Sequence, residues 1–166
     1  HAGYLFRGTV RENLLLAKPD GTDEEFWQVL EQMKLADFLR SEQGLDTMLA
    51  EKGSNFSGGQ CQRLVMARAL LHDSAVYIFD EATSNIDAES ENDIMEQIYQ
   101  MKGKKTVLLI SHRLANVTAA DKIYVLEQGK IAEQGNHETL ITQNGSYAKL
   151  WNTQQKLEDY RKEKAS

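Results

Sequence analysis

Three short stretches of the sequence carry residue types whose chemistry suits phosphate binding and the activation of water. They are Ser57-Gly58-Gly59-Gln60, Asp80-Glu81 and Ser111-His112. The first offers a hydroxyl and an uncovered backbone, and the other two offer carboxylates and an imidazole. Open backbone amides bind anions, whereas carboxylates and histidines hold metal ions and move protons. Each stretch adjoins a run of apolar residues, so buried elements must position it.

The stretch with two glycines predicts a helix that begins at a cap and is open to an anion. Ser57 can cap the helix, and Gln60 has the spacing that closes a capping box. Gly58 and Gly59 have no side chains to cover the N–H groups of the first turn. Because these groups and the helix dipole attract negative charge, the stretch predicts a phosphate site, with an ordinary capped helix as the alternative. The helix that follows, to about residue 71, is apolar almost all round, so we expect it to be largely buried.

Apolar runs precede both the acidic pair and the histidine. Residues 76–79 and 107–110 are short and rich in β-forming residues, which predicts two parallel strands buried on both faces. Ligands of open α/β sheets bind at the carboxyl ends of such strands. Asp80 and Glu81 are neighbours, and neighbouring side chains on a strand point to opposite faces. We therefore expect one carboxylate to hold a hydrated Mg²⁺ and the other to polarise a water molecule.

Local signals predict the other elements. Capping boxes at Thr9 and Thr22 begin two helices, and the second has an apolar face that continues to Leu39. Asp87 is placed to cap a further helix. The remaining expected elements are helices at 114–119, 136–143 and 146–155 and a hairpin of strands 122–126 and 130–133.

The length, net charge and cysteine content of the chain exclude some classes of protein. The chain has 166 residues, enough for one ordinary domain, and its formal net charge of −6 disfavours nucleic-acid binding, which needs a basic surface. The single cysteine, Cys61, cannot form an internal disulfide, and we expect it to have a packing role. No apolar stretch approaches the roughly 20 residues that span a bilayer, and no signal peptide is present.

In this order the stretches resemble the nucleotide-binding domain of an ABC transporter of the exporter type. The matching segments are the signature motif at Phe56–Gln60, the Walker B strand with its catalytic glutamate at Tyr77–Glu81, the D-loop at Ser84–Asp87 and the switch histidine His112. The flanks at residues 5–13 and 44–47 are similar to the exporter branch. The resemblance covers residue 1 to about residue 155.

The resemblance implies an α/β fold: part of a RecA-like P-loop NTPase core, with a mostly parallel sheet, and an α-helical signature subdomain. Residues 1–73 would form that subdomain with a Q-loop remnant, and the Q-loop glutamine would fall at His1 or just before it. Residues 74–155 would form the C-terminal part of the core, and residues 156–166 a charged tail that frays.

The Walker A pattern G-x-x-x-x-G-K-[ST] is absent from the sequence. We therefore expect the chain to be a C-terminal fragment of a longer protein that binds ATP very weakly by itself. In this type of sheet the Walker A strand lies between the strands ending at Ile110 and near Leu126. Its absence would leave two exposed apolar edges and favour self-association.

Members of the family hydrolyse ATP between two domains packed head to tail, and the resemblance assigns the roles. Asp80 would hold Mg²⁺ through water, Glu81 would orient and deprotonate the attacking water, and His112 would bind the γ-phosphate. The residues that would face the nucleotide from the signature motif and the D-loop are Ser57, Gly58, Gly59, Gln60 and Asp87. The implied cofactors are ATP and Mg²⁺. The implied partners are a second nucleotide-binding domain and the transmembrane domains of the same transporter, at the cytoplasmic face of the cell membrane, with no nucleic acid.

Three other functions share parts of this pattern. A soluble ABC-type ATPase of DNA maintenance would need coiled-coil heptads and basic surfaces, and neither occurs in the sequence. An ABC-type translation factor would show two tandem cassettes. A non-catalytic half of a heterodimeric transporter would account for the departures at Phe56 and Cys61, whereas Glu81 and His112 favour a catalytic domain.

Overall fold

The computed structural model describes residues 4–84 and 86–165, and the chain divides into two units, residues 1–110 and 111–166. Each unit is described by itself. The predictions for His1 in the Q-loop and for Asn85 in the D-loop lie outside the described residues. In the described part of the chain, no helix combines the length and the apolar character needed to cross a membrane.

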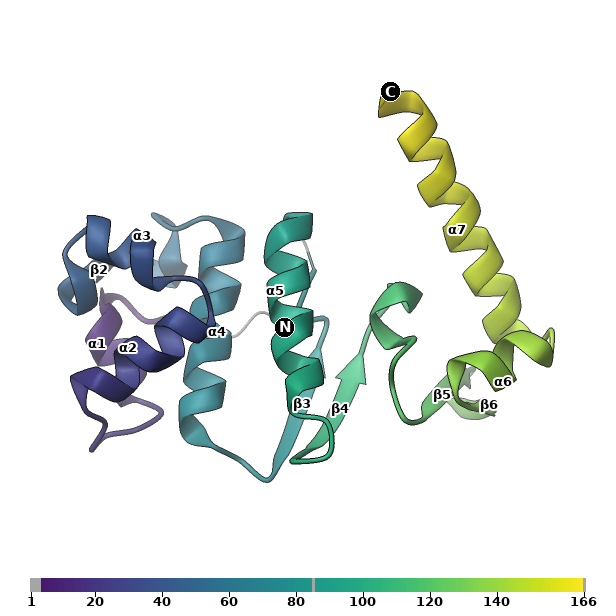
Figure 1. Ribbon diagram of the computed structural model, residues 1–166, viewed down its shortest axis with the longest axis horizontal. Helices are drawn as coiled ribbons and strands as arrows, with labels where there is room; N and C mark the ends of the chain where they lie inside the picture. Colours follow the sequence, from purple (N-terminus) through teal and green to yellow (C-terminus); the bar gives the residue numbers. More distant parts are fainter. Residues whose placement is uncertain (1–3, 85, 166) are drawn as a thin grey trace. The chain divides into compact units, whose positions relative to one another are not determined.

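The N-terminal part of the first unit is mainly helical (Figure 1). Its elements are β1 (Gly8–Thr9), α1 (Val10–Leu15), α2 (Asp23–Gln32), α3 (Ala36–Ser41), the 3-10 turns η1 (Gly44–Asp46) and η2 (Glu51–Gly53), β2 (Met48–Leu49) and α4 (Gly58–His72). The strands β1 and β2 pair antiparallel. The apolar sides of these helices meet in one core that contains Leu14, Phe26 and Leu64.

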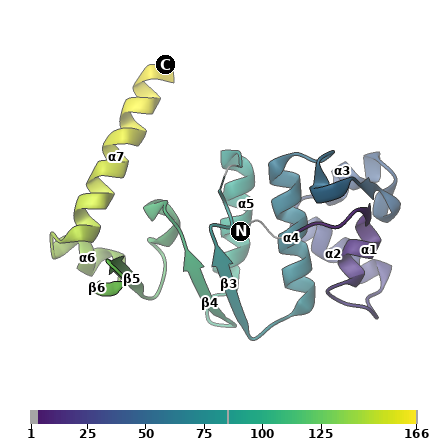
Figure 2. The same ribbon diagram turned by 180° about the vertical axis from the view of Figure 1, so that it is seen from behind.

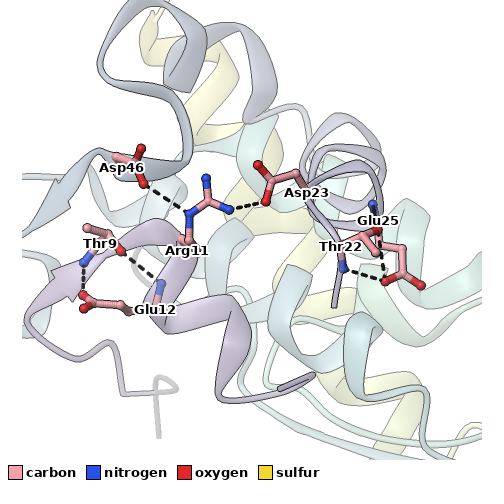
Figure 3. A network of polar contacts seen from close by, with 7 residues as sticks. All are labelled: Thr9, Arg11, Glu12, Thr22, Asp23, Glu25 and Asp46. Atoms are coloured by element: carbon pink, nitrogen blue, oxygen red, sulfur yellow. Dashed lines mark hydrogen bonds and ion pairs between the residues drawn. The ribbon is translucent and has the colours of Figure 1, made fainter. Parts of the chain in front are cut away.

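The two predicted capping boxes are confirmed, and one arginine links the elements that they begin. Thr9 caps α1 and Thr22 caps α2, each with the reciprocal glutamate bond. Figure 3 shows Arg11 of α1 between two acidic side chains, Asp23 at the start of α2 and Asp46 of η1. The Arg11 Nε to Asp46 Oδ1 distance is 3.2 Å. The ion pairs hold α1, α2 and η1 around the same core.

The expected continuous apolar face from the second helix to Leu39 is wrong, because α2 ends at Gln32. Lys34 adopts a left-handed conformation with φ of 53°. The amide of Lys34 then bonds the carbonyl of Glu31 at 2.9 Å, and that of Leu35 bonds the carbonyl of Leu30 at 2.8 Å. This pair of bonds is a Schellman motif, and it redirects the chain into α3.

The parallel pair predicted from the apolar runs is confirmed. β3 (Val76–Asp80) and β4 (Thr106–Ile110) run parallel in register, with Asp80 opposite Ile110. α5 (Ala88–Gln100) connects them, as the crossover of a parallel pair requires. Both views show α5 beside the two strands and α4 beside α5 (Figures 1 and 2).

The expectation that both strands are buried on both faces is wrong. Alternate residues of β3, Tyr77 and Phe79, lie in the core with Ile94 and Ile98 of α5. The other face is open: the exposed fractions there are 55% for Val76, 66% for Ile78, 50% for Leu108 and 44% for Ile110. Helices cover one face of the pair only, and the period of two in a strand sends every second side chain to the uncovered face. The expectation that α4 is largely buried is also wrong, because several of its apolar residues are only half-buried.

The second unit contains the predicted hairpin and the C-terminal helices. Its elements are η3 (Leu114–Val117), β5 (Ile123–Glu127), β6 (Lys130–Gly135), α6 (His137–Thr142) and α7 (Ser146–Ala165). Gln128 and Gly129 both have positive φ, the backbone of a two-residue hairpin turn. The expected end of the last helix near residue 155 is wrong, since α7 continues to Ala165. The added segment is rich in Lys and Glu, which favour helix.

Candidate functional site

The start of α4 is capped as the sequence predicts, and in the described part of the chain the amides of exposed Gly58 and buried Gly59 in its first turn are left without hydrogen bonds. Ser57 Oγ accepts from the Gln60 amide at 3.1 Å, and Gln60 Oε1 accepts from the Ser57 amide at 2.9 Å. Within the described residues, no hydrogen bond engages the amides of Gly58 and Gly59. Ser57 and Gly58 are exposed. Because α4 has 15 residues, its dipole adds to these two donors, and the helix start fits a phosphate group.

Gly59 has a second reason to be glycine, which the sequence argument missed. A Cβ atom there would lie 2.1 Å from Ser90 Oγ and 2.9 Å from Asp87 Oδ2. The beginning of α5 therefore packs directly on the beginning of α4, and only a residue without a side chain leaves room for it. The structure thus brings Asp87 next to the predicted phosphate-binding helix start.

Asp87 caps α5, as predicted. Its Oδ1 accepts from the Ser90 amide and its Oδ2 accepts from Ser90 Oγ, both at 2.8 Å. These bonds, the backbone one first, together with the charge of Arg63, lower the pKa of the Asp87 carboxyl below its usual value. Asp87 is therefore ionised at neutral pH and carries a fixed negative charge beside the start of α4.

A buried ion pair between α4 and α5 supports this arrangement, and the sequence analysis did not find it. The Asp93 carboxylate is 7% exposed, with its Oδ1 2.6 Å from Lys34 Nζ and its Oδ2 3.5 Å from Arg63 Nη1. Arg63 Nη2 also donates to Ser90 Oγ at 3.0 Å. In the described residues, Arg63 Nε and Asp93 Oδ2 are buried without hydrogen-bond partners.

One signal for this pair was present in the sequence. Ser90, Asp93 and Gln97 recur at helical spacing on the side of α5 that also carries Ile94. Polar residues on an apolar helix face must find partners when they are buried. What the spacing does not reveal is the partner, because Arg63 and Lys34 are far away along the chain.

The acidic pair lies at the end of β3, and its two members differ in backbone conformation. Asp80 is the last strand residue, and Glu81 leaves the strand with a left-handed φ of 51°. The argument from alternating strand side chains therefore does not apply to Glu81. The Glu81 amide donates to the carbonyl of Ile110 at 3.0 Å, which ties the turn to the end of β4. Both carboxylate residues are exposed, and a left-handed non-glycine residue is a feature often found at functional sites.

These residues fit a hydrated magnesium ion and a nucleotide phosphate. Mg²⁺ binds through one or two carboxylates and takes its remaining ligands from water and phosphate oxygens. The described part of the chain has no cluster of three or more histidine, cysteine or acidic side chains that could hold a metal ion. The exposed carboxylates at the end of β3 suit an ion that is shared with a phosphate ligand.

His112 is the second residue of the second unit and is exposed. Its backbone carbonyl accepts from Gln154 Nε2 at 2.6 Å. The neighbouring turn is closed by Ser111 Oγ, which accepts from the Arg113 amide at 3.0 Å. The predicted switch histidine therefore lies in a loop with defined hydrogen bonds at the carboxyl end of β4.

Cys61 packs as the sequence suggested. Its Sγ donates to the carbonyl of Gly53 at 3.4 Å, and burial raises the pKa of its thiol. A raised pKa keeps the sulfur neutral and unreactive at neutral pH.

Comparisons with known proteins agree with the resemblance. Residues 3–84 match the family model described as ABC transporter. Over 161 residues, 97% of this chain, the sequence is 54% identical to an uncharacterized ABC transporter ATP-binding protein of Haemophilus influenzae, of which it spans 29%. It is 44% identical over 147 residues, 88% of this chain and 24% of the relative, to the ATP-dependent lipid A-core flippase 1 of Colwellia psychrerythraea.

A solved structure of a bacterial Atm1-family ABC exporter with ATP bound is similar in fold. The TM-score is 0.85 at 34% sequence identity, over 93% of this chain and 27% of that one. The chain thus spans about a quarter of the length of the relatives that it matches. With the capped glycine helix start, the parallel strand pair and the acidic strand end already described, these matches show that the chain belongs to the ABC transporter family, as part of an exporter-type ATP-binding domain.

Proposed function

We propose that this chain supplies the signature motif and the catalytic carboxylate of an ABC exporter, in which ATP hydrolysis drives transport across a membrane. The observation that carries the proposal is the start of α4, where Ser57 caps the helix and Asp87 lies alongside. There the amides of Gly58 and Gly59 make no hydrogen bond within the described residues. The names of the relatives support the direction of transport, since they include a flippase and an exporter.

Each predicted residue has one task in this mechanism. The phosphoryl transfer needs positioning and charge stabilisation, which a bound Mg²⁺ supplies by neutralising phosphate oxygens. Asp80 would hold the ion, and Glu81 would orient the attacking water and accept its proton. His112 donates a hydrogen bond to the γ-phosphate.

The signature residues act on the nucleotide of a second domain. Ser57 to Gln60 present the start of α4 to the γ-phosphate that the partner domain holds, and Asp87 lies between the two sites. This division makes the head-to-tail pair of nucleotide-binding domains the active unit. The transmembrane domains of the same transporter are its mechanical partners, and the domain works at the cytoplasmic face of the membrane.

The replacement Glu81→Gln tests the proposal in the transporter that contains this chain. We expect ATP turnover to fall by about 10²- to 10⁴-fold, the usual contribution of a general base. Nucleotide-dependent pairing of the two domains is expected to persist, because the amide retains the size of the side chain. Turnover is measured as phosphate release, and pairing by cross-linking.

The matched control is Glu127→Gln, which removes an exposed carboxylate at the end of β5. That variant should hydrolyse ATP at the rate of the unaltered transporter. Near-normal turnover in Glu81→Gln would contradict the role of Glu81 as the base.

A further inference from the structure

One side-chain amide bonds two successive peptide groups of the backbone that directly follows the Cα atom of the predicted switch histidine. Gln154, from the middle of α7, donates through Nε2 to the carbonyl of His112 at 2.6 Å. Its Oε1 accepts from the amide of Leu114 at 2.9 Å. The two contacts span 42 and 40 residues of sequence and both lie within the second unit.

This pair of bonds fixes a short piece of backbone in the way that a neighbouring strand would. A primary amide presents one donor and one acceptor side by side, which match a carbonyl and an amide two residues apart. Leu114 also begins η3, so the same bond satisfies a helix-start amide that has no partner inside the helix. Together with the Ser111 turn, the contacts determine the direction in which the Cα–Cβ bond of His112 leaves the loop.

The helix that carries Gln154 is itself anchored. The Glu133 carboxylate of β6 accepts from the amides of Ser146 and Tyr147, the latter at 3.1 Å, and so caps the start of α7. Gly145 has no side chain to obstruct this cap, since a Cβ there would lie 1.9 Å from Glu133 Oε1. Tyr147 is fully buried. The β5–β6 hairpin thus holds α7, and α7 holds the loop of His112.

We propose that Gln154 is a positioning residue for His112 and that α7 thereby controls whether the histidine reaches the γ-phosphate. The proposal rests on the proposed function, in which His112 contacts that phosphate. Any movement of α7 is transmitted through one rigid amide to the two peptide groups that follow His112, the first of which carries the carbonyl of His112 itself.

The decisive variant is Gln154→Glu. The carboxylate has nearly the same size and still accepts from the Leu114 amide. It cannot donate to the His112 carbonyl, so one carboxylate oxygen would face that carbonyl oxygen without a hydrogen between them. Gln154→Ala removes both bonds. The matched control is Gln155→Glu, which makes the same change of charge one position further along α7, at a side chain for which the described residues show no hydrogen bond.

The first measurement uses this chain alone, in NMR spectra labelled at histidine and at backbone amides. We expect the Leu114 amide to exchange about tenfold faster in Gln154→Ala than in Gln154→Glu, because only the alanine variant loses that bond. The signals of His112 should move in both variants and stay in place in Gln155→Glu. Unchanged His112 signals and unchanged Leu114 exchange in Gln154→Ala would overturn the proposal.

The second measurement is ATP turnover of the transporter that contains the chain. We expect Gln154→Glu to lower kcat about tenfold with KM for ATP little changed, because one hydrogen bond in the transition state is misdirected. If Gln154→Glu turns over as fast as Gln155→Glu, while Glu81→Gln is inactive, Gln154 does not position His112. A transporter without ATPase activity, combined with the expected NMR changes, would instead overturn the proposed function and leave the backbone contacts of Gln154 established.

Discussion

Asp87 connects the two elements that face the nucleotide in the proposed mechanism. Its carboxylate caps α5 through Ser90, and the same group packs on Gly59 at the start of α4. A negative charge so close to a phosphate-binding helix start is tolerated because it is already engaged by Ser90 and faces Arg63. Asp87 therefore links the D-loop, in which it lies, to the signature motif, on which it packs.

The charge of Asp87 should make stability depend on pH. Hydrogen bonds from Ser90 lower the pKa of this carboxyl in the folded chain, so its stabilising effect is fully present above the ordinary pKa of aspartate and is lost as the pH falls through the lowered folded value. Asp87→Asn keeps a capping side chain but has no charge. We expect it to lower the thermal unfolding midpoint at neutral pH, and the difference from the unaltered chain to shrink as the solution is acidified.

Circular dichroism melts across an acidic pH series measure this difference. The control is Asp20→Asn, a substitution of the same kind at an exposed position in a turn. A difference for Asp87→Asn that stays constant through the acidic range would show that the charge is not responsible.

At the scale of elements, the contact of α4 with α5 sets the geometry of the site. Asp93 lies between Arg63 of α4 and Lys34 at the end of α2. Such a buried pair contributes little when both charges are present, but the loss of one partner leaves the other without compensation. The pair therefore fixes the relative position of the helices more than it adds to stability.

We expect Asp93→Asn to lower the free energy of unfolding by about 2 kcal/mol, the cost of leaving a buried charged group poorly paired. Urea denaturation of the chain measures the change. Glu96→Gln is the comparison, because it removes an acidic charge from an exposed position of the same helix. Equal stabilities of the two variants would mean that Asp93 does not hold α4 against α5.

At the scale of the whole molecule, the uncovered face of the β3–β4 pair has the largest consequence. The exposed apolar residues on this face are Val76, Ile78, Leu108 and Ile110. Among the described residues, no further strand pairs with the outer edges of β3 and β4. Exposed apolar strands of this kind associate with other chains. From the missing Walker A strand, the sequence predicted exposed strand edges and self-association, but it did not predict this open face.

We therefore expect the chain by itself to self-associate as its concentration rises, and Ile78→Thr to weaken that association by placing a hydroxyl on the apolar face. Light scattering across a concentration series measures the mass. Leu16→Thr, at an exposed apolar residue of the helical part, should leave the association unchanged. A monomer at every concentration would contradict the expectation.

The sequence by itself determined the local elements and the order of the motifs. The capping boxes at Thr9, Thr22 and Ser57 join residues three positions apart, so their hydrogen bonds can be read from spacing. The hairpin turn and the two apolar strands are likewise local in origin. The family followed from the order of these motifs.

Only the tertiary structure decided which faces are covered and which distant side chains meet. The strands are open on one face because helices pack on the other, and no local pattern states how many layers surround a strand. Lys34 and Asp93 are 59 residues apart, and Gln154 reaches His112 across 42 residues. Contacts between residues so far apart in the sequence depend on how whole helices pack. The spacing of residue types along the chain predicts only the hydrogen bonds within a single helix, strand or turn.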